Sequence, residues 1–177
     1  MVQSLSQPLP AAWTVRQGLD AYLKENGFTR EGYFAKTTDA SLFGIGFTIP
    51  NTEAHRRAIM RHDLHHVATG FGTDLRGEAE ISAWELARGI GGVGAYVTAI
   101  VWSVVLAGAA IAPLRMRRAV RAANGRGSLF QVDDYEGLLD LTIGELRARL
   151  GVPSAGLAGQ RALHSKAPRP DATFARA

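Results

Sequence analysis

The chain has 177 residues, of which 46% are hydrophobic, and 20 lysines and arginines outnumber 16 acidic residues, giving a net charge of +4. This length and apolar content suit one domain with a sizeable core. The absence of cysteine excludes disulfide bonds and thiolate metal sites, so a bound metal must use nitrogen and oxygen ligands. No motif interleaves aromatic with basic residues, and we expect no nucleic-acid partner.

The first predicted helix begins at Thr14, where Gln17 completes a capping-box pattern, and ends before Gly27, a typical C-terminal stop. Residues 1–13 lack the charged and apolar regions of a signal peptide, so we expect a flexible N-terminus and a cytoplasmic protein. Residues 28–51 are rich in glycine, threonine and aromatic side chains. They are predicted to form an irregular, partly buried connection.

Two further helices are predicted on either side of a glycine-containing turn. The second helix spans about 52–69 and is capped by Asn51 or Thr52. Gly70 and Gly72 then interrupt the helical pattern. The third helix is capped by Asp74 or the threonine before it and runs to Arg88. The turn allows the third helix to fold back against the second.

Residues 89–114 contain no charged side chain and many glycines and alanines. The segment is long enough to cross a bilayer, but it also suits the central buried helix of an all-α domain, which we favour. Pro113 is expected to end or kink it. The next segment, RMRRAVRAANGR at 115–126, carries five arginines and no acid. A basic block beside an apolar run indicates anionic lipid heads, and a solvated basic helix is the alternative.

The last predicted elements are short helices. The acidic pair at 133–134 opens one, and Thr142 with Glu145 forms a second capping box that opens another. The small, polar and basic tail at 154–177 is predicted to be disordered. The fold expected is therefore all-α, with a single helical domain over 14–153 that includes one long apolar helix.

Histidines are concentrated in the second predicted helix. His62 and His66 lie four residues apart, so they share one helix face and can bind one cation together. His65 is expected to point to solvent beside Arg61. His55 lies on the same side as His62 and suits either a supporting polar role or none. A hydrogen-bonded polar cluster remains the alternative to a metal site.

A carboxylate from the third helix is expected to complete the ligand set. Glu80 and Glu85 have arginines nearby, Arg76 and Arg88, and are predicted to form salt bridges on a solvated face. Glu78 has no basic residue three or four positions away and lies on an apolar stripe, so it should face inward. Because a buried carboxylate needs a cation or several donors, we predict a metal site between these two adjacent helices.

The spacing of these residues resembles a known signature. His62-Asp63-x-x-His66, followed after eleven residues by Glu78, matches the motif of the coenzyme Q biosynthesis protein 4 family. The glycine-rich stretch GFGTDLRGE resembles the turn that leads into that family's next helix. By this resemblance, all four motif residues are metal ligands and form the catalytic site.

The resemblance extends over about 30–153 and includes the segment 133–152, where an acidic-aromatic start leads to a leucine-arginine helix. It implies an all-α fold, a homodimer, and peripheral association with the inner face of the membrane. The implied partners are a prenylated aromatic or quinone lipid and other quinone-biosynthesis enzymes. The implied cofactor is one divalent metal ion, with zinc favoured and iron or manganese possible.

The activity implied is a step of ubiquinone synthesis, in which the ring carboxylate of a polyprenylated hydroxybenzoate is replaced by a hydroxyl group. A metal beside the phenol oxygen would lower the pKa of the phenol and make the ring electron-rich. Two alternatives stay open. One is a non-catalytic scaffold or prenyl-lipid carrier. The other, suggested by the adjacent His62-Asp63 pair, is a metal phosphohydrolase, which would need further ligands on other helices.

Overall fold

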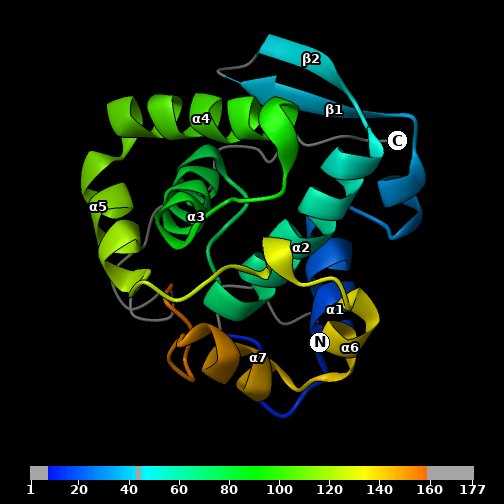
Figure 1. Ribbon diagram of the computed structural model, residues 1–177, viewed down its shortest axis with the longest axis vertical. Coiled ribbons are helices and arrows are strands. Elements are labelled where there is room, and N and C mark those ends of the chain that lie inside the picture. Colours follow the sequence, from blue (N-terminus) through cyan, green and yellow to red (C-terminus); the bar gives the residue numbers. More distant parts are fainter. Residues whose placement is uncertain (1–7, 43–44, 159–177) are drawn as a thin grey trace.

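The computed structural model describes residues 8–42 and 45–158 (Figure 1). This part of the chain is predominantly helical and contains one two-stranded sheet, which confirms the predicted all-α class. The elements in chain order are α1 (Val15–Asn26), η1 (Glu31–Phe34), β1 (Thr37–Leu42), β2 (Ile45–Pro50), α2 (Glu53–Thr69), α3 (Leu75–Arg88), α4 (Gly94–Ile111), α5 (Pro113–Ala122), η2 (Leu129–Gln131), α6 (Tyr135–Asp140) and α7 (Ile143–Leu150).

Helix ends follow the local signals in the sequence. The hydroxyl of Thr14 accepts from the backbone N–H of Gln17 at 3.2 Å, and the Gln17 side chain accepts from the Thr14 N–H at 2.9 Å. The same reciprocal pair opens α7 at Thr142. Asp74 caps α3, and Gly70 closes α2 with a φ of 74°. The left-handed conformation at Gly70 ends α2 and turns the chain into the short connection that leads to α3.

The connection predicted at 28–51 is wrong in part, because it contains regular structure. After the short helix η1, β1 and β2 form an antiparallel hairpin in which Thr37 pairs with Pro50 and Thr38 with Ile49. The β-branched residues at both ends favour extended backbone. Glycine and aspartate interrupt the alternation that would otherwise identify a strand, which is why the pattern predicts only a connection.

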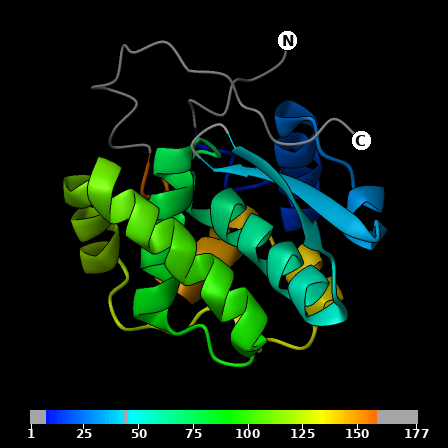
Figure 2. The same ribbon diagram turned by 90° about the horizontal axis from the view of Figure 1, so that it is seen from above.

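The apolar segment does not form a buried central helix, so that prediction is also wrong. Helix α4 covers residues 94–111, and only 17% of it is buried. It ends before Pro113, the first residue of α5. Figure 1 and Figure 2 show α4 and α5 as an angled pair at the outside of α3. By length and composition alone, α4 is a candidate membrane span.

Close packing of α4 on α3 depends on Gly108. A Cβ atom at this position would lie 2.3 Å from the Cβ of Ala79 and 2.8 Å from the sulfur of Met116. The two helices therefore approach more closely than a side chain here would allow. This contact fixes the position of α3, which carries the acidic residues of the site described below.

Replacing Gly108 by valine is expected to lower the free energy of unfolding by about 1–3 kcal/mol, because α4 must move off α3 to make room. Urea denaturation followed by circular dichroism measures the change. Ala110→Val, at an exposed position of the same helix, is the matched control and should change stability by less than about 1 kcal/mol. Equal effects in the two variants would show that Gly108 has no special packing role.

The core lies around α2 and α3, where α1, α7 and the C-terminal part of the described chain meet them. Its largest fully buried apolar side chains include Leu19, Leu64, Trp84 and Ile143. Leu157 and Ala158, which we expected in the tail, also pack against it. The backbone N–H groups of Leu157 and Ala158 both donate to the carbonyl of Thr69, the last residue of α2. The predicted tail beyond residue 158 lies outside the described residues.

The segment just before α1 is similarly attached. The carbonyl oxygen of Trp13 accepts from the N–H of Ile143 at 2.8 Å, and the carbonyl of Ala11 accepts from Gly144 at 2.9 Å. The Leu9 carbonyl accepts from the guanidinium of Arg147, a buried residue of α7, at 3.0 Å. The part of the predicted flexible N-terminus that the structure describes is therefore bonded to α7.

Candidate metal centre

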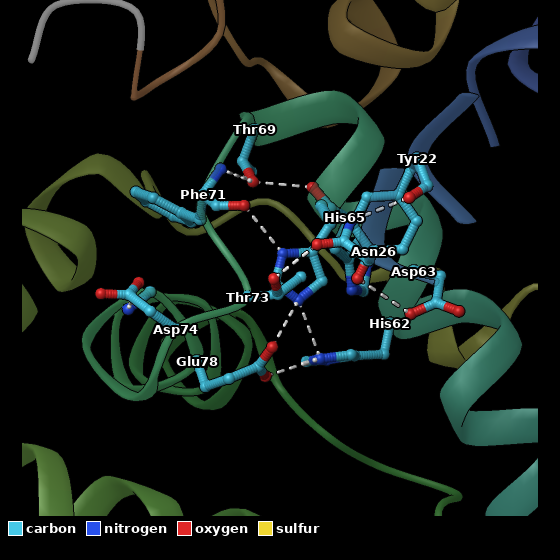
Figure 3. Close-up of polar contacts among 12 residues, drawn as sticks. Tyr22, Asn26, His62, Asp63, His65, Thr69, Phe71, Thr73, Asp74 and Glu78 are labelled. Carbon is cyan, nitrogen blue, oxygen red and sulfur yellow. Dashed lines mark hydrogen bonds and ion pairs between the residues drawn. The ribbon is translucent and has the colours of Figure 1, made fainter. Parts of the chain in front are cut away.

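Three side chains from two helices converge at the C-terminal half of α2. His62 and His66 come from α2 and Glu78 from the first turn of α3, and one possible ligand atom of each lies within 4.8 Å of the others. The Nε2 atoms of the two histidines are 3.1 Å apart. Glu78 Oε2 lies 3.2 Å from His62 Nε2, and Glu78 Oε1 lies 3.4 Å from His66 Nε2. Figure 3 shows Glu78 directed from α3 toward His62.

These separations fit the edges of a metal coordination shell. Ligands at 2.0–2.1 Å from a tetrahedral metal ion are about 3.3–3.4 Å from one another. The three observed distances, 3.1, 3.2 and 3.4 Å, are close to that value. The residues present therefore suit a divalent cation held by two imidazole nitrogens and a carboxylate.

The other ring nitrogens of the two histidines determine which atoms face the centre. His66 Nδ1 lies 2.9 Å from the carbonyl oxygen of Phe71, and His62 Nδ1 lies 2.9 Å from a carboxylate oxygen of Glu85. Both Nδ1 atoms must donate, because a carbonyl and a carboxylate only accept. A neutral imidazole then presents the lone pair of Nε2 to the centre. Two such lone pairs facing one carboxylate require a proton or a metal ion between them.

Charge at this centre also favours a cation. Burial raises the pKa of Glu78, but the neighbouring charges and hydrogen bonds of His66 and His62 outweigh it and hold that pKa well below its ordinary value. Burial lowers the pKa of His62, but Glu85 and Glu78 outweigh it and raise that pKa well above its ordinary value. Without a metal, Glu78 is therefore ionised and His62 carries a proton near neutral pH, and a bound cation would take the place of that proton.

The centre is reachable from solvent. The side chains of His62 and Glu78 are 21% and 19% exposed, whereas that of His66 is 1% exposed. A small ligand can therefore approach from the side of His62 and Glu78. Three protein ligands with access from one side leave coordination positions for water or substrate, which distinguishes catalytic from structural metal sites.

Asp63, the fourth residue of the motif, has different partners. Its oxygens accept from the hydroxyls of Tyr22, at 3.4 Å, and Tyr33, and it does not belong to the converging group of three. In the view of Figure 3 its carboxylate lies to the right of His62, whereas Glu78 lies to the left. Burial raises the pKa of Asp63. Its role as a metal ligand stays a prediction, and its present contacts attach α1 and η1 to α2.

Asp63→Asn is expected to lower the free energy of unfolding by about 1–3 kcal/mol, because an amide NH₂ cannot accept from a tyrosine hydroxyl. If Asp63 acts through these contacts alone, the folded variant should still bind one metal ion per chain. Thermal unfolding and metal analysis of the same preparation measure both quantities. Loss of metal at unchanged stability would instead identify Asp63 as a ligand.

Two residues that the helix pattern placed on a solvated face are buried beside the centre. His65 and Glu85 are both 0% exposed. Their contact, 2.6 Å from His65 Nδ1 to Glu85 Oε1, joins α2 to α3. The prediction is wrong because η2 and the adjoining loop cover this side of α2, where Leu129 donates its N–H to His65 Nε2 at 3.0 Å. A polar residue on a helix gives no local signal of such a cover.

Glu80 and Arg61, also predicted on solvated faces, are buried as well, at 0% and 4% exposed. Glu80 pairs with Arg115 of α5 at 2.8 Å rather than with Arg76 of its own helix. Arg61 donates to the carbonyl of Val132 at 2.7 Å. Each partner is more than thirty residues away in the chain, so spacing within a helix could not identify it.

Of the two remaining histidines, the structure describes only His55, and it is not part of the centre. His55 is buried near the start of α2, where its Nδ1 lies 3.2 Å from Asn51 Oδ1, and its ring contacts the edge of Tyr96. It does not belong to the converging group. His164 lies outside the described residues.

Comparison of the chain with protein-family models, curated proteins and solved structures gave no match. The geometry of His62, His66 and Glu78 is therefore the main structural indication of function. The resemblance to the coenzyme Q biosynthesis protein 4 family rests on the sequence alone, that is on the motif residues and on the segments that surround them.

Proposed function

We propose that the chain is a metal-dependent enzyme whose cation is bound by His62, His66 and Glu78. The observation that carries this proposal is the convergence of two inward-facing Nε2 atoms and an ionised carboxylate at metal-ligand spacing. Zinc is the proposed metal because it binds imidazole and carboxylate in a tetrahedral arrangement, and iron and manganese also accept these donors. Asp63 is a proposed fourth ligand or an orienting residue.

The proposed substrate is a prenylated hydroxybenzoate, and the proposed reaction replaces the ring carboxylate with a hydroxyl group. The carboxylate leaves as carbon dioxide. One atom of dioxygen becomes the new hydroxyl and takes up one proton, and the other becomes water with two further protons; an external reductant supplies the two electrons, and the remaining protons come from solvent. A bound metal would lower the pKa of a phenol placed beside it. The motif resemblance and the apolar surface of α4 support this choice of substrate.

The surface of α4 and α5 suits a lipid with a long tail. Tyr96, Trp102 and Leu106 on α4 are 42%, 46% and 67% exposed. Exposed arginines follow on α5, including Arg117 and Arg118. An apolar helix face bordered by arginines binds the interface of an anionic bilayer. We therefore propose that the protein lies peripherally on the inner face of the membrane, where a prenylated substrate would be available. Its proposed protein partners are a second copy of the chain and other quinone-biosynthesis enzymes.

The direct test is turnover of a short-chain prenylated 4-hydroxybenzoate by protein loaded with zinc, iron(II) or manganese(II), supplied with dioxygen and a reductant. Release of carbon dioxide and formation of the hydroxylated ring are measured together. The wild type should convert the substrate, and His66→Ala should lose conversion by on the order of 100-fold or more. Equal conversion by both proteins would contradict the proposed role of the centre.

A second candidate function is a non-catalytic carrier of a prenyl lipid, which the exposed face of α4 favours. A carrier would bind prenylated lipid equally well in the wild type and in His62→Ala, with no chemical change. The phosphohydrolase alternative has less support, because the converging group in the described part of the chain does not include the aspartate of the His62-Asp63 pair.

A further inference from the structure

Glu85 occupies an unusual position for an acidic residue. Its side chain is 0% exposed, and its Oε1 atom accepts from two imidazoles, His62 Nδ1 at 2.9 Å and His65 Nδ1 at 2.6 Å. Its Oε2 atom is buried without a hydrogen-bond partner. No lysine or arginine of the described residues forms an ion pair with it. A buried carboxylate in this setting is stabilised when one of its two imidazole partners carries positive charge, either as a proton or through a bound metal ion.

The arrangement places His62 between two carboxylates of one helix. Glu78 and Glu85 are seven residues apart, so they project from the same face of α3 two turns apart. Glu78 lies at Nε2 of His62, and Glu85 lies at Nδ1 of the same ring. One carboxylate therefore belongs to the candidate metal centre, while the other holds the back of the ligand ring.

We propose that Glu85 is a positioning residue for the metal centre, which fixes the tautomer and orientation of His62 without contacting the metal. This inference rests on the proposed metal site. A histidine ligand whose second nitrogen donates to a carboxylate keeps its metal-binding nitrogen deprotonated and becomes a stronger donor. The geometry at His62 is of this type, because the carboxylate can only accept from Nδ1.

His65 contacts the same oxygen of Glu85 as His62 does. Its Nδ1 donates to Glu85, and its Nε2 accepts the backbone N–H of Leu129 at 3.0 Å. The ring also lies edge-on to Trp84 and Phe130, each at 5.2 Å between ring centroids. Both nitrogens of His65 are used inside the protein, so it supports the carboxylate and is not a ligand. The chain from Leu129 to His65, Glu85 and His62 connects η2 with the candidate centre.

The test is Glu85→Gln, which keeps the shape of the side chain and removes its charge. The dissociation constant for zinc, measured by competition with a chromophoric chelator, is expected to rise about 10–100-fold. Glu80→Gln is the matched control, because Glu80 is equally buried in the same helix but pairs with Arg115. Its zinc affinity should stay within about threefold of the wild type. Equal affinities in the two variants would overturn the inference.

Nitrogen-15 NMR of the histidine side chains shows which ring nitrogen of His62 carries a proton and which binds the metal. This measurement distinguishes a positioning role of Glu85 from a purely structural one. The zinc-loaded protein should show His62 protonated at Nδ1 and metal-bound at Nε2, and Glu85→Gln should weaken the Nδ1–H signal of the carboxylate-bonded form. Metal at Nδ1 of His62 would overturn the inference even if Glu85→Gln fails to fold. Failure of the wild type to bind zinc would instead contradict the proposed function.

Discussion

Glu78→Gln is expected to weaken zinc binding by on the order of 100-fold or more, because it removes the only anionic donor in the converging group of three. The amide keeps the volume of the carboxylate, so α3 should retain its position. The Nε2 atoms of His62 and His66 would remain 3.1 Å apart, but two neutral imidazoles alone bind a divalent cation weakly. Competition with a chromophoric chelator measures the dissociation constant.

Glu53→Gln is the control for this experiment. Glu53 is an exposed acid in the first turn of α2, the helix that carries both histidines. The substitution changes the net charge by the same amount but leaves the centre intact, so zinc affinity should stay within about threefold of the wild type. If both variants bind zinc as tightly as the wild type, Glu78 is not a ligand.

Arg88→Met is expected to lower the free energy of unfolding by about 3–5 kcal/mol. The Arg88 guanidinium donates to three backbone carbonyls, those of Ala123 at 2.6 Å, Gly127 at 2.8 Å and Leu150 at 2.9 Å. It also lies 4.3 Å from the centre of the Trp84 ring. Methionine keeps the apolar stem but leaves these carbonyls without a donor, so α3 would lose its attachment to the ends of α5 and α7.

Urea denaturation gives the change in stability, with Arg149→Met as the control. Arg149 is exposed on α7, and its replacement should alter stability by no more than about 0.5 kcal/mol. A loss of several kcal/mol is a large part of the stability of a small domain. Arg88→Met should therefore unfold at a clearly lower urea concentration than the wild type. A variant as stable as the wild type would show that these hydrogen bonds contribute little.

Local signals in the sequence are sufficient to predict several helix ends and the pair of histidines on one face of α2. Thr14 with Gln17 and Thr142 with Glu145 form capping boxes because the interactions involve residues three apart. His62 and His66 share a face for the same reason, since four residues make about one helical turn. These features depend only on backbone geometry within one element.

The buried polar residues could not be predicted in this way. Glu85 is predicted on a solvated face because Arg88 offers a partner within the helix, and His65 is predicted to point to solvent beside Arg61. Both elements that cover these helices lie far along the chain, because η2 covers His65 on α2 and α5 packs against α3. A helix surrounded on several sides has no single apolar stripe, so periodicity did not reveal which acids face the interior.

The position of α4 has a similar explanation. An uncharged helix of 18 residues with a mean hydropathy of 1.9 has the same composition whether protein or lipid covers it. Composition alone therefore cannot distinguish the two environments. We expect burial by protein, whereas the structure places most of the helix on the surface. The hairpin at Thr37–Pro50 was missed because glycines and an aspartate interrupt its alternation.

The metal content of the purified protein tests the central claim most directly. The protein is reconstituted with zinc, iron(II) or manganese(II), dialysed, and analysed for bound metal beside His62→Ala. The account predicts close to one metal ion per chain in the wild type and loss of that ion in the variant, with both proteins folded by circular dichroism. A wild-type protein that retains none of the three metals would contradict it and would make this centre a charged hydrogen-bonded cluster.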